Sequence, residues 1–212
     1  MNELKLDTIV LGVVQTNTYI ISNPEQGEAI VIDPSDAAGR LLEYLKTNDL
    51  VCKGILLTHG HFDHILAAKE LKESTQAPIY AHEAEERLLG DEKLNASDFI
   101  QKRLSLQPDI LLKDEELLRL AGFKIKVLHT PGHTAGGACY YFEDYKTLIS
   151  GDTLFYEDIG RWDLPTGDHR QLVEAIDRKL MRLEDSVKVY PGHGQPTTIG
   201  HERKHNSYLT LD

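Results

Sequence analysis

Four potential metal ligands lie within six consecutive positions, namely His59, His61, Asp63 and His64. Neutral imidazole and carboxylate are side chains that zinc, iron and manganese accept, and the His-x-His alternation lets two imidazoles approach one ion. Because one tetrahedral ion cannot readily take all four groups, the segment predicts two metal sites that share one loop. A solvated histidine-rich loop without a metal is the alternative interpretation.

Three later segments each place one further potential ligand beside glycine, at the end of a predicted strand. These ligands are His133 in Thr-Pro-Gly-His-Thr, Asp152 in Ser-Gly-Asp-Thr and His193 in Tyr-Pro-Gly-His-Gly. Glycine permits a positive φ and a close backbone approach, which a loop wrapped around an ion requires. We therefore expect all three loops to meet the first one at a single metal centre.

Short strands and helices must hold these loops. A buried strand over 54–57 precedes the first loop, and a helix over 65–74 follows it. Other strands are predicted by alternation or by short apolar runs. They cover 4–14, 18–21, 29–32, 77–81, 110–120, 123–128, 138–142, 147–149 and 187–189.

Two β-rich halves, each closed by helices, indicate an α+β fold with two mixed sheets face to face and helices on the outer faces. A length of 212 residues suits one domain, which we expect to span 1–212. The segment 90–108 is the least regular part and lies between the two halves. It is either a lid over the site or a surface helix.

Two residues outside the ligand set have two interpretations each. Asp33 could accept a hydrogen bond from a metal-bound imidazole, or it could simply begin the turn before Pro34. His82, at the start of a charged stretch, is interpreted as a capping or surface residue rather than a substrate contact.

The ordered set H-x-H-x-D-H, G-H-T, G-D-T and P-G-H-G resembles the metallo-β-lactamase superfamily over nearly the whole chain. Within that superfamily, the motif sequences look most like those of the glyoxalase II-like hydrolases, the short hydroxyacylglutathione hydrolase-like enzymes. The resemblance implies the αββα sandwich and two sites that share a bridging carboxylate. It assigns His59, His61 and His133 to one metal, Asp63, His64 and His193 to the other, and Asp152 to the bridge.

Such a site is suited to hydrolysis. Two metal ions about 3.5–4 Å apart hold a hydroxide as nucleophile near neutral pH and polarise the carbonyl group. A thiol with a pKa of about 8.5 can leave as thiolate, so a thioester needs no general acid. We expect a dinuclear hydrolase of a small thioester, S-lactoylglutathione or a related one, that uses a metal-bridging hydroxide. Zinc is the default ion, iron and manganese are alternatives, and Asp63 is our candidate catalytic residue.

The stretch 154–168 follows Asp152 directly and is rich in aromatic and charged residues. We expect it to form a wall of the substrate pocket, with Arg161 as the anion contact and Tyr156 or Trp162 as the packing surface. The alternative is a structural interaction between Arg161 and Asp163 that holds the loop.

Only 195–212 follow the last ligand motif. Full-length glyoxalase II enzymes carry a helical C-terminal domain that supplies much of the glutathione site. We expect no such glutathione-binding domain here, and therefore weak hydrolysis of S-lactoylglutathione.

Three other functions fit the sequence less well. Persulfide dioxygenases with one iron share the Gly-Arg-x-Asp wording, but their last histidine usually lies in Ala-His-Asp, whereas this chain has Gly192-His193-Gly194. Zinc β-lactamases carry cysteine or another pattern where this chain has Asp152. A binding module without turnover is disfavoured by the intact ligand set.

Composition narrows the partners. The formal net charge is −11, which disfavours a nucleic-acid surface. Two cysteines without a C-x-x-C motif fit a reducing compartment. The N-terminal stretch lacks the apolar core of a signal peptide, and no apolar run reaches membrane-spanning length. We expect a cytoplasmic protein with a small-molecule substrate and no nucleic-acid or membrane partner.

Overall fold

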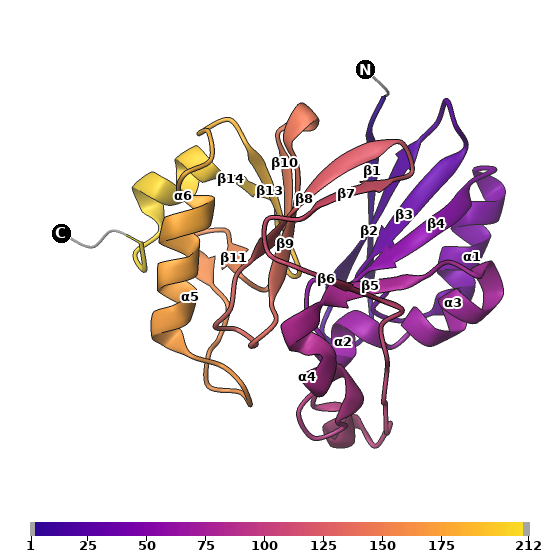
Figure 1. Ribbon diagram of the computed structural model, residues 1–212, viewed down its shortest axis with the longest axis horizontal. Coiled ribbons are helices and arrows are strands. Elements are labelled where there is room, and N and C mark those ends of the chain that lie inside the picture. The colour runs from indigo at the N-terminus through magenta and orange to yellow at the C-terminus, as the bar shows by residue number, and fades with distance from the viewer. Residues whose placement is uncertain (1–2, 210–212) are drawn as a thin grey trace.

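The computed structural model describes residues 3–209 of the chain, and within them two β-sheets pack face to face with helices on both outer sides (Figure 1). The first sheet has six strands in the order β1-β2-β3-β4-β5-β6. These strands are β1 Lys5–Leu11, β2 Thr16–Asn23, β3 Glu28–Ile32, β4 Val51–Leu56, β5 Ile79–His82 and β6 Ile110–Leu112. Both antiparallel and parallel pairs occur in it, so the sheet is mixed.

The second sheet is also mixed and has six strands in the order β14-β13-β10-β9-β8-β7. They are β7 Leu117–Leu120, β8 Phe123–His129, β9 Ala138–Phe142, β10 Thr147–Gly151, β13 Lys188–Pro191 and β14 Thr197–Thr198. A separate two-stranded ribbon joins β11 Leu154–Phe155 to β12 Asp158–Ile159. The ribbon follows β10 directly and begins the predicted pocket wall.

Helices cover the two outer faces. Figure 1 shows α1 (Ala38–Thr47) and α3 (Ala68–Thr75) outside the first sheet, and α5 (His169–Ala175) and α6 (Ile199–His205) outside the second. The π-helical turn η4 (Ile176–Leu180) continues α5. The remaining short helices are α2 Phe62–Ile65, η1 Glu83–Glu85, α4 Glu86–Gly90, η2 Ser97–Ile100 and η3 Glu143–Tyr145.

The period-two alternation of side chains along the strands explains this layering. In β2, Tyr19 and Ile21 enter the core between the sheets, whereas Ile20 packs with Leu41 and Leu45 of α1. In the second sheet, inward side chains meet those of the first, while the outward ones form a third core with α5 and η4. Both faces of each sheet are thus buried. The expected α+β sandwich with outer helices is confirmed.

Several predicted boundaries were wrong. The predicted strand 110–120 is two strands in different sheets, because β6 pairs with β5 and β7 pairs with β8. The positive φ of Glu115, 62°, turns the chain between them. The predicted helix 65–74 begins earlier and is broken into α2 and α3.

Both cysteines are buried and unpaired. No helix within 3–209 is long and apolar enough to cross a membrane.

Candidate metal centre

All seven predicted ligands lie at one edge of the sandwich, because four strands end there. The first loop follows β4, and it leads into α2, which carries Asp63 and His64. His133, Asp152 and His193 follow β8, β10 and β13, which run in the same direction in the second sheet. Residues up to 134 positions apart in the sequence therefore meet between the two sheets.

His59, His61 and His133 form the first group, and each is buried. Their potential ligand atoms all lie within 4.8 Å of one another. Nδ1 of His61 is 2.9 Å from Nε2 of His133, and that atom is 3.3 Å from Nε2 of His59. Three imidazole nitrogens thus converge on one point, as at a three-histidine metal site.

Asp63, His64 and His193 form the second group. Oδ2 of Asp63 lies 3.4 Å from Nε2 of His64 and 3.2 Å from Nε2 of His193. Asp152 lies between the groups. Its Oδ1 is 3.4 Å from Nε2 of His64, and its Oδ2 is 3.6 Å from Nε2 of both His133 and His193. Its two oxygens therefore face both groups, as expected of a bridging carboxylate.

Unsatisfied polar atoms show that these residues fit cations. Nε2 of His61, Nε2 of His64 and Oδ1 of Asp152 are buried and have no hydrogen-bond partner among residues 3–209. Leaving a polar atom buried in this way costs about 1–3 kcal/mol. Nε2 of His64 and Oδ1 of Asp152 face the other potential ligands, so bound cations would satisfy these two atoms, whereas His61 faces its group through Nδ1.

The protonation states of His59, His61 and Asp152 also suit metal binding. Burial lowers the pKa of His61 to about 3 and also lowers that of His59, so both imidazoles are neutral at physiological pH. Burial alone would raise the pKa of Asp152, but the neighbouring His64, His133 and His193 lower it to about 2. Metal binding needs unprotonated ligands, and the site keeps these three in that form.

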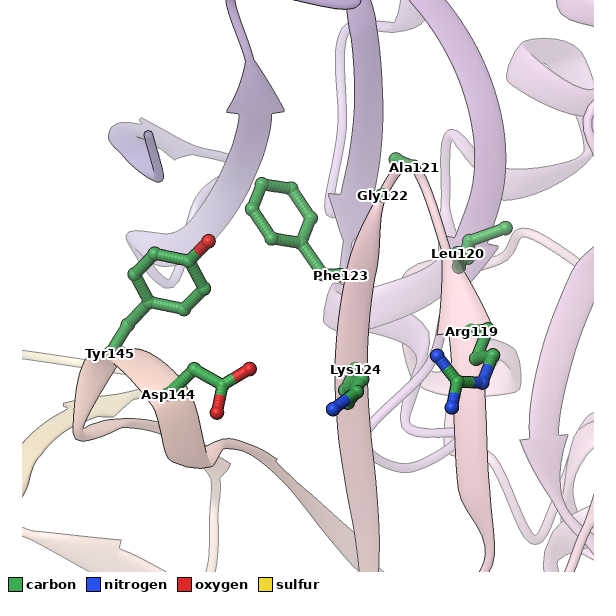
Figure 2. Close-up of a pocket in the computed structure, with 8 residues that line it drawn as sticks. All are labelled: Arg119, Leu120, Ala121, Gly122, Phe123, Lys124, Asp144 and Tyr145. Atoms are coloured by element: carbon green, nitrogen blue, oxygen red, sulfur yellow. The ribbon is translucent and has the colours of Figure 1, made fainter. Parts of the chain in front are cut away.

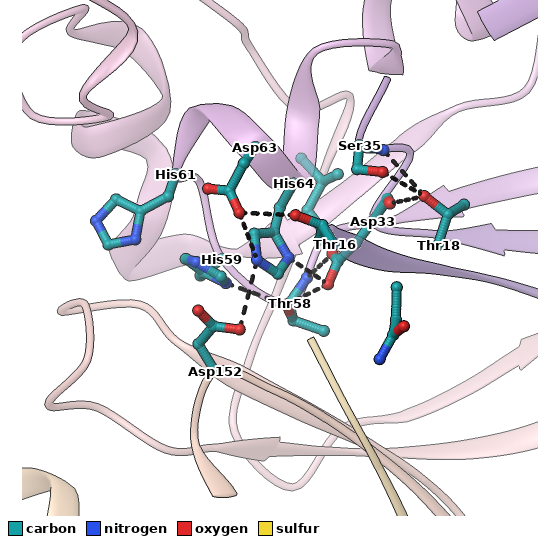
Figure 3. Close-up of polar contacts among 12 residues, drawn as sticks. Thr16, Thr18, Asp33, Ser35, Thr58, His59, His61, Asp63, His64 and Asp152 are labelled. Carbon is teal, nitrogen blue, oxygen red and sulfur yellow. Dashed lines mark hydrogen bonds and ion pairs between the residues drawn. The ribbon is translucent and has the colours of Figure 1, made fainter. Parts of the chain in front are cut away.

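Asp33 anchors the second group from behind, as Figure 3 shows. Its Oδ2 lies 2.9 Å from Nδ1 of His64, while its Oδ1 accepts a hydrogen bond of 2.7 Å from the backbone N–H of Thr58. The hydroxyl of Thr58 donates to Oδ2 at 2.6 Å. The interpretation of Asp33 as the partner of a ligand imidazole is confirmed.

Two further contacts orient ligands and were not predicted. The Thr16 hydroxyl donates to Oδ2 of Asp63 at 2.8 Å (Figure 3). Nδ1 of His133 lies 2.7 Å from the backbone carbonyl oxygen of Arg161. A carbonyl oxygen can only accept, so Nδ1 of His133 carries the proton and Nε2 is left to ligate.

The three predicted substrate contacts have protein partners instead. The Arg161 guanidinium donates two hydrogen bonds, of 2.8 and 2.9 Å, to the exposed carboxylate of Asp163. The structural interaction weighed for this pair is therefore confirmed. Tyr156 stacks on His201 with ring centroids 4.8 Å apart, and the ring centroids of Trp162 and His169 are 4.2 Å apart. Their roles in substrate binding stay predictions.

A pocket of about 130 Å³ opens beside Asp63. Its walls are largely apolar, and their charged side chains are those of Lys102, Asp36 and Asp63. The walls comprise Gly12, Val13, Val14, Ser35, Asp36, Phe62, Asp63, Leu66, Ile100 and Lys102. Lys102 belongs to the segment 90–108, for which the sequence indicates a lid or a surface helix, whereas Val13 and Val14 were not among the predicted site residues. Both valines are exposed at a hairpin turn, and this exposure, which would have identified them, can be seen only in the structure. Part of the segment 90–108 therefore reaches the site.

A larger cavity, of about 400 Å³, lies at the turn between β7 and β8 (Figure 2). Arg119 and Lys124 flank that turn, and Asp144 and Tyr145 face it from η3. Its lining includes none of the seven predicted ligands. The pocket beside Asp63 is accordingly the one that bears on the metal centre.

Comparisons with known proteins agree with this geometry. A family model described as the Metallo-beta-lactamase superfamily matches residues 11–193. Hydroxyacylglutathione hydrolase GloC of Haemophilus influenzae is 36% identical over 209 residues, which cover 97% of this chain and 98% of that protein.

Two solved structures are also similar. The BLEG-1 B3 metallo-beta-lactamase is 40% identical, with a TM-score of 0.93 over 98% of this chain and 100% of that one. TTHA1623, in a di-iron-bound form, is 35% identical, with a TM-score of 0.84 over 96% of this chain and 100% of that one.

Proposed function

Because this chain belongs to the metallo-beta-lactamase superfamily, we propose that it is a metal-dependent hydrolase that cleaves a small thioester. The observation that carries the proposal is the meeting of seven imidazole and carboxylate groups at one edge of the sandwich. Nε2 of His64 and Oδ1 of Asp152 are buried there without a hydrogen-bond partner among residues 3–209, as expected of atoms that await a cation.

Two divalent ions would supply a water-derived nucleophile at neutral pH and polarise the carbonyl group of the substrate. His59, His61 and His133 would hold one, Asp63, His64 and His193 the other, and Asp152 would contact both. Zinc is our first choice of ion. The di-iron form of TTHA1623 supports iron as the alternative.

The protonation of Asp63 favours a thioester over an amide. Asp63 lines the pocket beside the metal centre, so a substrate in that pocket contacts its carboxylate. Burial would raise the pKa of Asp63, but His64, His193 and the Thr16 hydroxyl lower it well below its usual range. An ionised Asp63 has no proton to donate to a leaving group. A thiolate can leave without one, because the pKa of a thiol is only about 8.5.

The walls of the pocket indicate the shape of the substrate. Val13, Val14 and Ile100 would contact an aliphatic part. The Lys102 ammonium has no ion pair or side-chain hydrogen bond within residues 3–209 and is thus available to an anionic group. Arg161, on the loop after β12, would be a second anion contact. The likeness to GloC supports a glutathione thioester as one candidate substrate.

A second candidate function is β-lactam hydrolysis, which the likeness to the BLEG-1 enzyme favours. The sequence alone had disfavoured it. The ionised state of Asp63 disfavours this reaction, because the amide nitrogen of a β-lactam is a poorer leaving group than a thiolate and Asp63 has no proton to donate to it.

Steady-state kinetics on a matched panel test the proposal. The panel contains S-lactoylglutathione, short aliphatic acyl thioesters with and without a terminal carboxylate, and a chromogenic β-lactam. We expect the largest kcat/KM for a small thioester, and two metal ions per chain by elemental analysis. One iron per chain, with oxygen consumed on glutathione persulfide, would replace hydrolysis by dioxygenation. A kcat/KM for the β-lactam above every thioester would favour the second candidate.

A further inference from the structure

Glu85 is a fully buried carboxyl group that none of the arguments above uses. It ends η1, the short helix that follows β5. Its Oε1 accepts a hydrogen bond of 2.8 Å from the backbone N–H of Gly60, and its Oε2 accepts one of 2.7 Å from that of Gly136. Each oxygen therefore has one backbone donor.

The two donors belong to the loops of the first ligand group. Gly60 lies between His59 and His61, and Gly136 lies three positions after His133. The first loop extends from the first sheet and the second loop from the second sheet. One side chain thus connects the backbones on which all three histidines of the first group stand.

The two glycines that donate to Glu85 are closely packed against neighbouring residues. A Cβ atom on Gly136 would lie 2.2 Å from the backbone nitrogen of Glu85. A Cβ atom on Gly60 would lie 2.7 Å from the side chains of Leu88 and Leu89 in α4. Both loops approach the η1–α4 segment closely, and at Gly136, which faces backbone atoms, only glycine fits.

Burying a carboxylate costs free energy, and the hydrogen bonds of Glu85 explain why one is present here. Burial raises the pKa of Glu85 to about 7, although the Gly60 N–H, the Thr134 hydroxyl and the Gly136 N–H act in the opposite direction. Backbone donors need acceptors when they are buried. A carboxylate supplies two acceptor oxygens with a fixed separation, which no neutral side chain of this size does.

We propose that Glu85 is a positioning residue that sets the spacing of His59 and His61 against His133, and thereby the metal affinity of the first group. The inference rests on the metal centre of the proposed function but not on the identity of the substrate. Residues that orient metal ligands through hydrogen bonds typically change metal affinity about 10–100-fold when they are altered.

The decisive variant is Glu85→Gln, which keeps the size of the side chain. Glutamine offers one oxygen and one NH2 group, so a donor would face either the Gly60 or the Gly136 N–H. The first group should then lose affinity by about 10–100-fold. Glu202→Gln is the matched control, because Glu202 is also fully buried and accepts from a backbone N–H, that of Glu157, while none of its hydrogen bonds within residues 3–209 reaches one of the seven predicted ligands.

Zinc titration against a chromophoric chelator, with metal-free protein, gives the readout, and single-site backgrounds separate the two groups. In a His193→Ala background, Glu85→Gln should weaken zinc binding at the intact first group. In a His61→Ala background, it should leave the second group within about threefold of the unaltered Glu85 protein. Glu202→Gln should change neither affinity, whatever it does to the melting temperature.

Equal weakening of both groups, or unchanged affinity in the His193→Ala background, would overturn the proposal. If Glu85→Gln does not fold, Glu85→Asp decides. Aspartate is one methylene shorter and cannot reach both N–H groups, so the first group should again be weakened selectively. Absence of any zinc binding by the wild-type protein would instead overturn the proposed function, which keeps the two failures distinct.

Discussion

The carboxylate of Asp33 lies 2.9 Å from Nδ1 of His64, and both side chains are almost completely buried. The contact assigns the imidazole proton to Nδ1, because an ionised carboxylate can only accept. Nε2 of His64 then lies 3.4 Å from both Asp63 and Asp152. Burial would lower the pKa of this imidazole, but Asp63, Asp152 and Asp33 raise it, so a metal ion would have to displace a proton from Nε2. Asp33 thus directs the lone pair of His64 toward the centre of the second ligand group.

Asp33→Asn should weaken metal binding at the second group by about 10–100-fold, because a neutral amide holds the imidazole less firmly. The measurement is zinc competition in a His61→Ala background. Ser35→Ala is the control, since the Ser35 hydroxyl contacts Thr18 at 2.8 Å and not the Asp33 carboxylate. Equal affinities for Asp33→Asn and the parent protein would contradict the orienting role.

Asp152→Ala should abolish turnover and lower the metal content from two ions per chain, because this carboxylate faces both groups and offsets the repulsion between two cations. Elemental analysis after gel filtration gives the metal content. Asp144→Ala, which removes an exposed carboxylate on η3, is the control and should retain both ions. Two ions and near-normal turnover in Asp152→Ala would show that Asp152 does not bridge.

Arg161→Ala should raise KM for anionic thioesters more than for neutral ones, because it removes an exposed cation from the loop beside the centre. Exposed charge interactions contribute about 0.2–1 kcal/mol, so the differential effect should be a factor of roughly 1.4 to 5. Asp163→Ala frees the guanidinium from its partner and should change KM in the opposite direction. The same increase for neutral and anionic substrates would indicate a structural effect alone.

The stability of the fold should fall as the pH falls from about 6.5 to about 4, partly through His82. Burial, and then the stacked ring of His129 at 3.8 Å, lower the pKa of His82 to about 4, with Lys179 acting in the same direction and Asp114 against it. The unfolded chain, with a histidine pKa of about 6.5, binds more protons than the folded one in this window. Protonation therefore favours unfolding.

Urea unfolding at pH 7.5, 6 and 5 measures this dependence. His82 also accepts a hydrogen bond from the backbone N–H of Ala84, which confirms its interpretation as a capping residue. Asparagine can replace that cap, so His82→Asn should keep the fold and flatten the pH dependence. An identical slope for both proteins would assign the effect to other groups.

The seven candidate ligands could be predicted from the sequence, because the chemistry that a metal requires is local. Imidazole and carboxylate beside glycine at a strand end leave a short signature, and the side-chain alternation of 18–21 and 123–128 identified the strands that hold it. Two mixed sheets with outer helices followed from the same alternation. These features depend on neighbours within a few residues.

Contacts between distant segments left no such signature. Glu85 lies 51 positions from Gly136, Thr16 lies 47 positions from Asp63, and neither pair could be predicted from spacing. Alternation continued through 110–120 although the chain changes sheets there, because each strand alternates whichever partner it has. Tertiary structure alone decided between the two interpretations of Asp33 and revealed the contact of Arg161 with Asp163, since a carboxylate or guanidinium takes whichever partner the folded chain brings within hydrogen-bond distance.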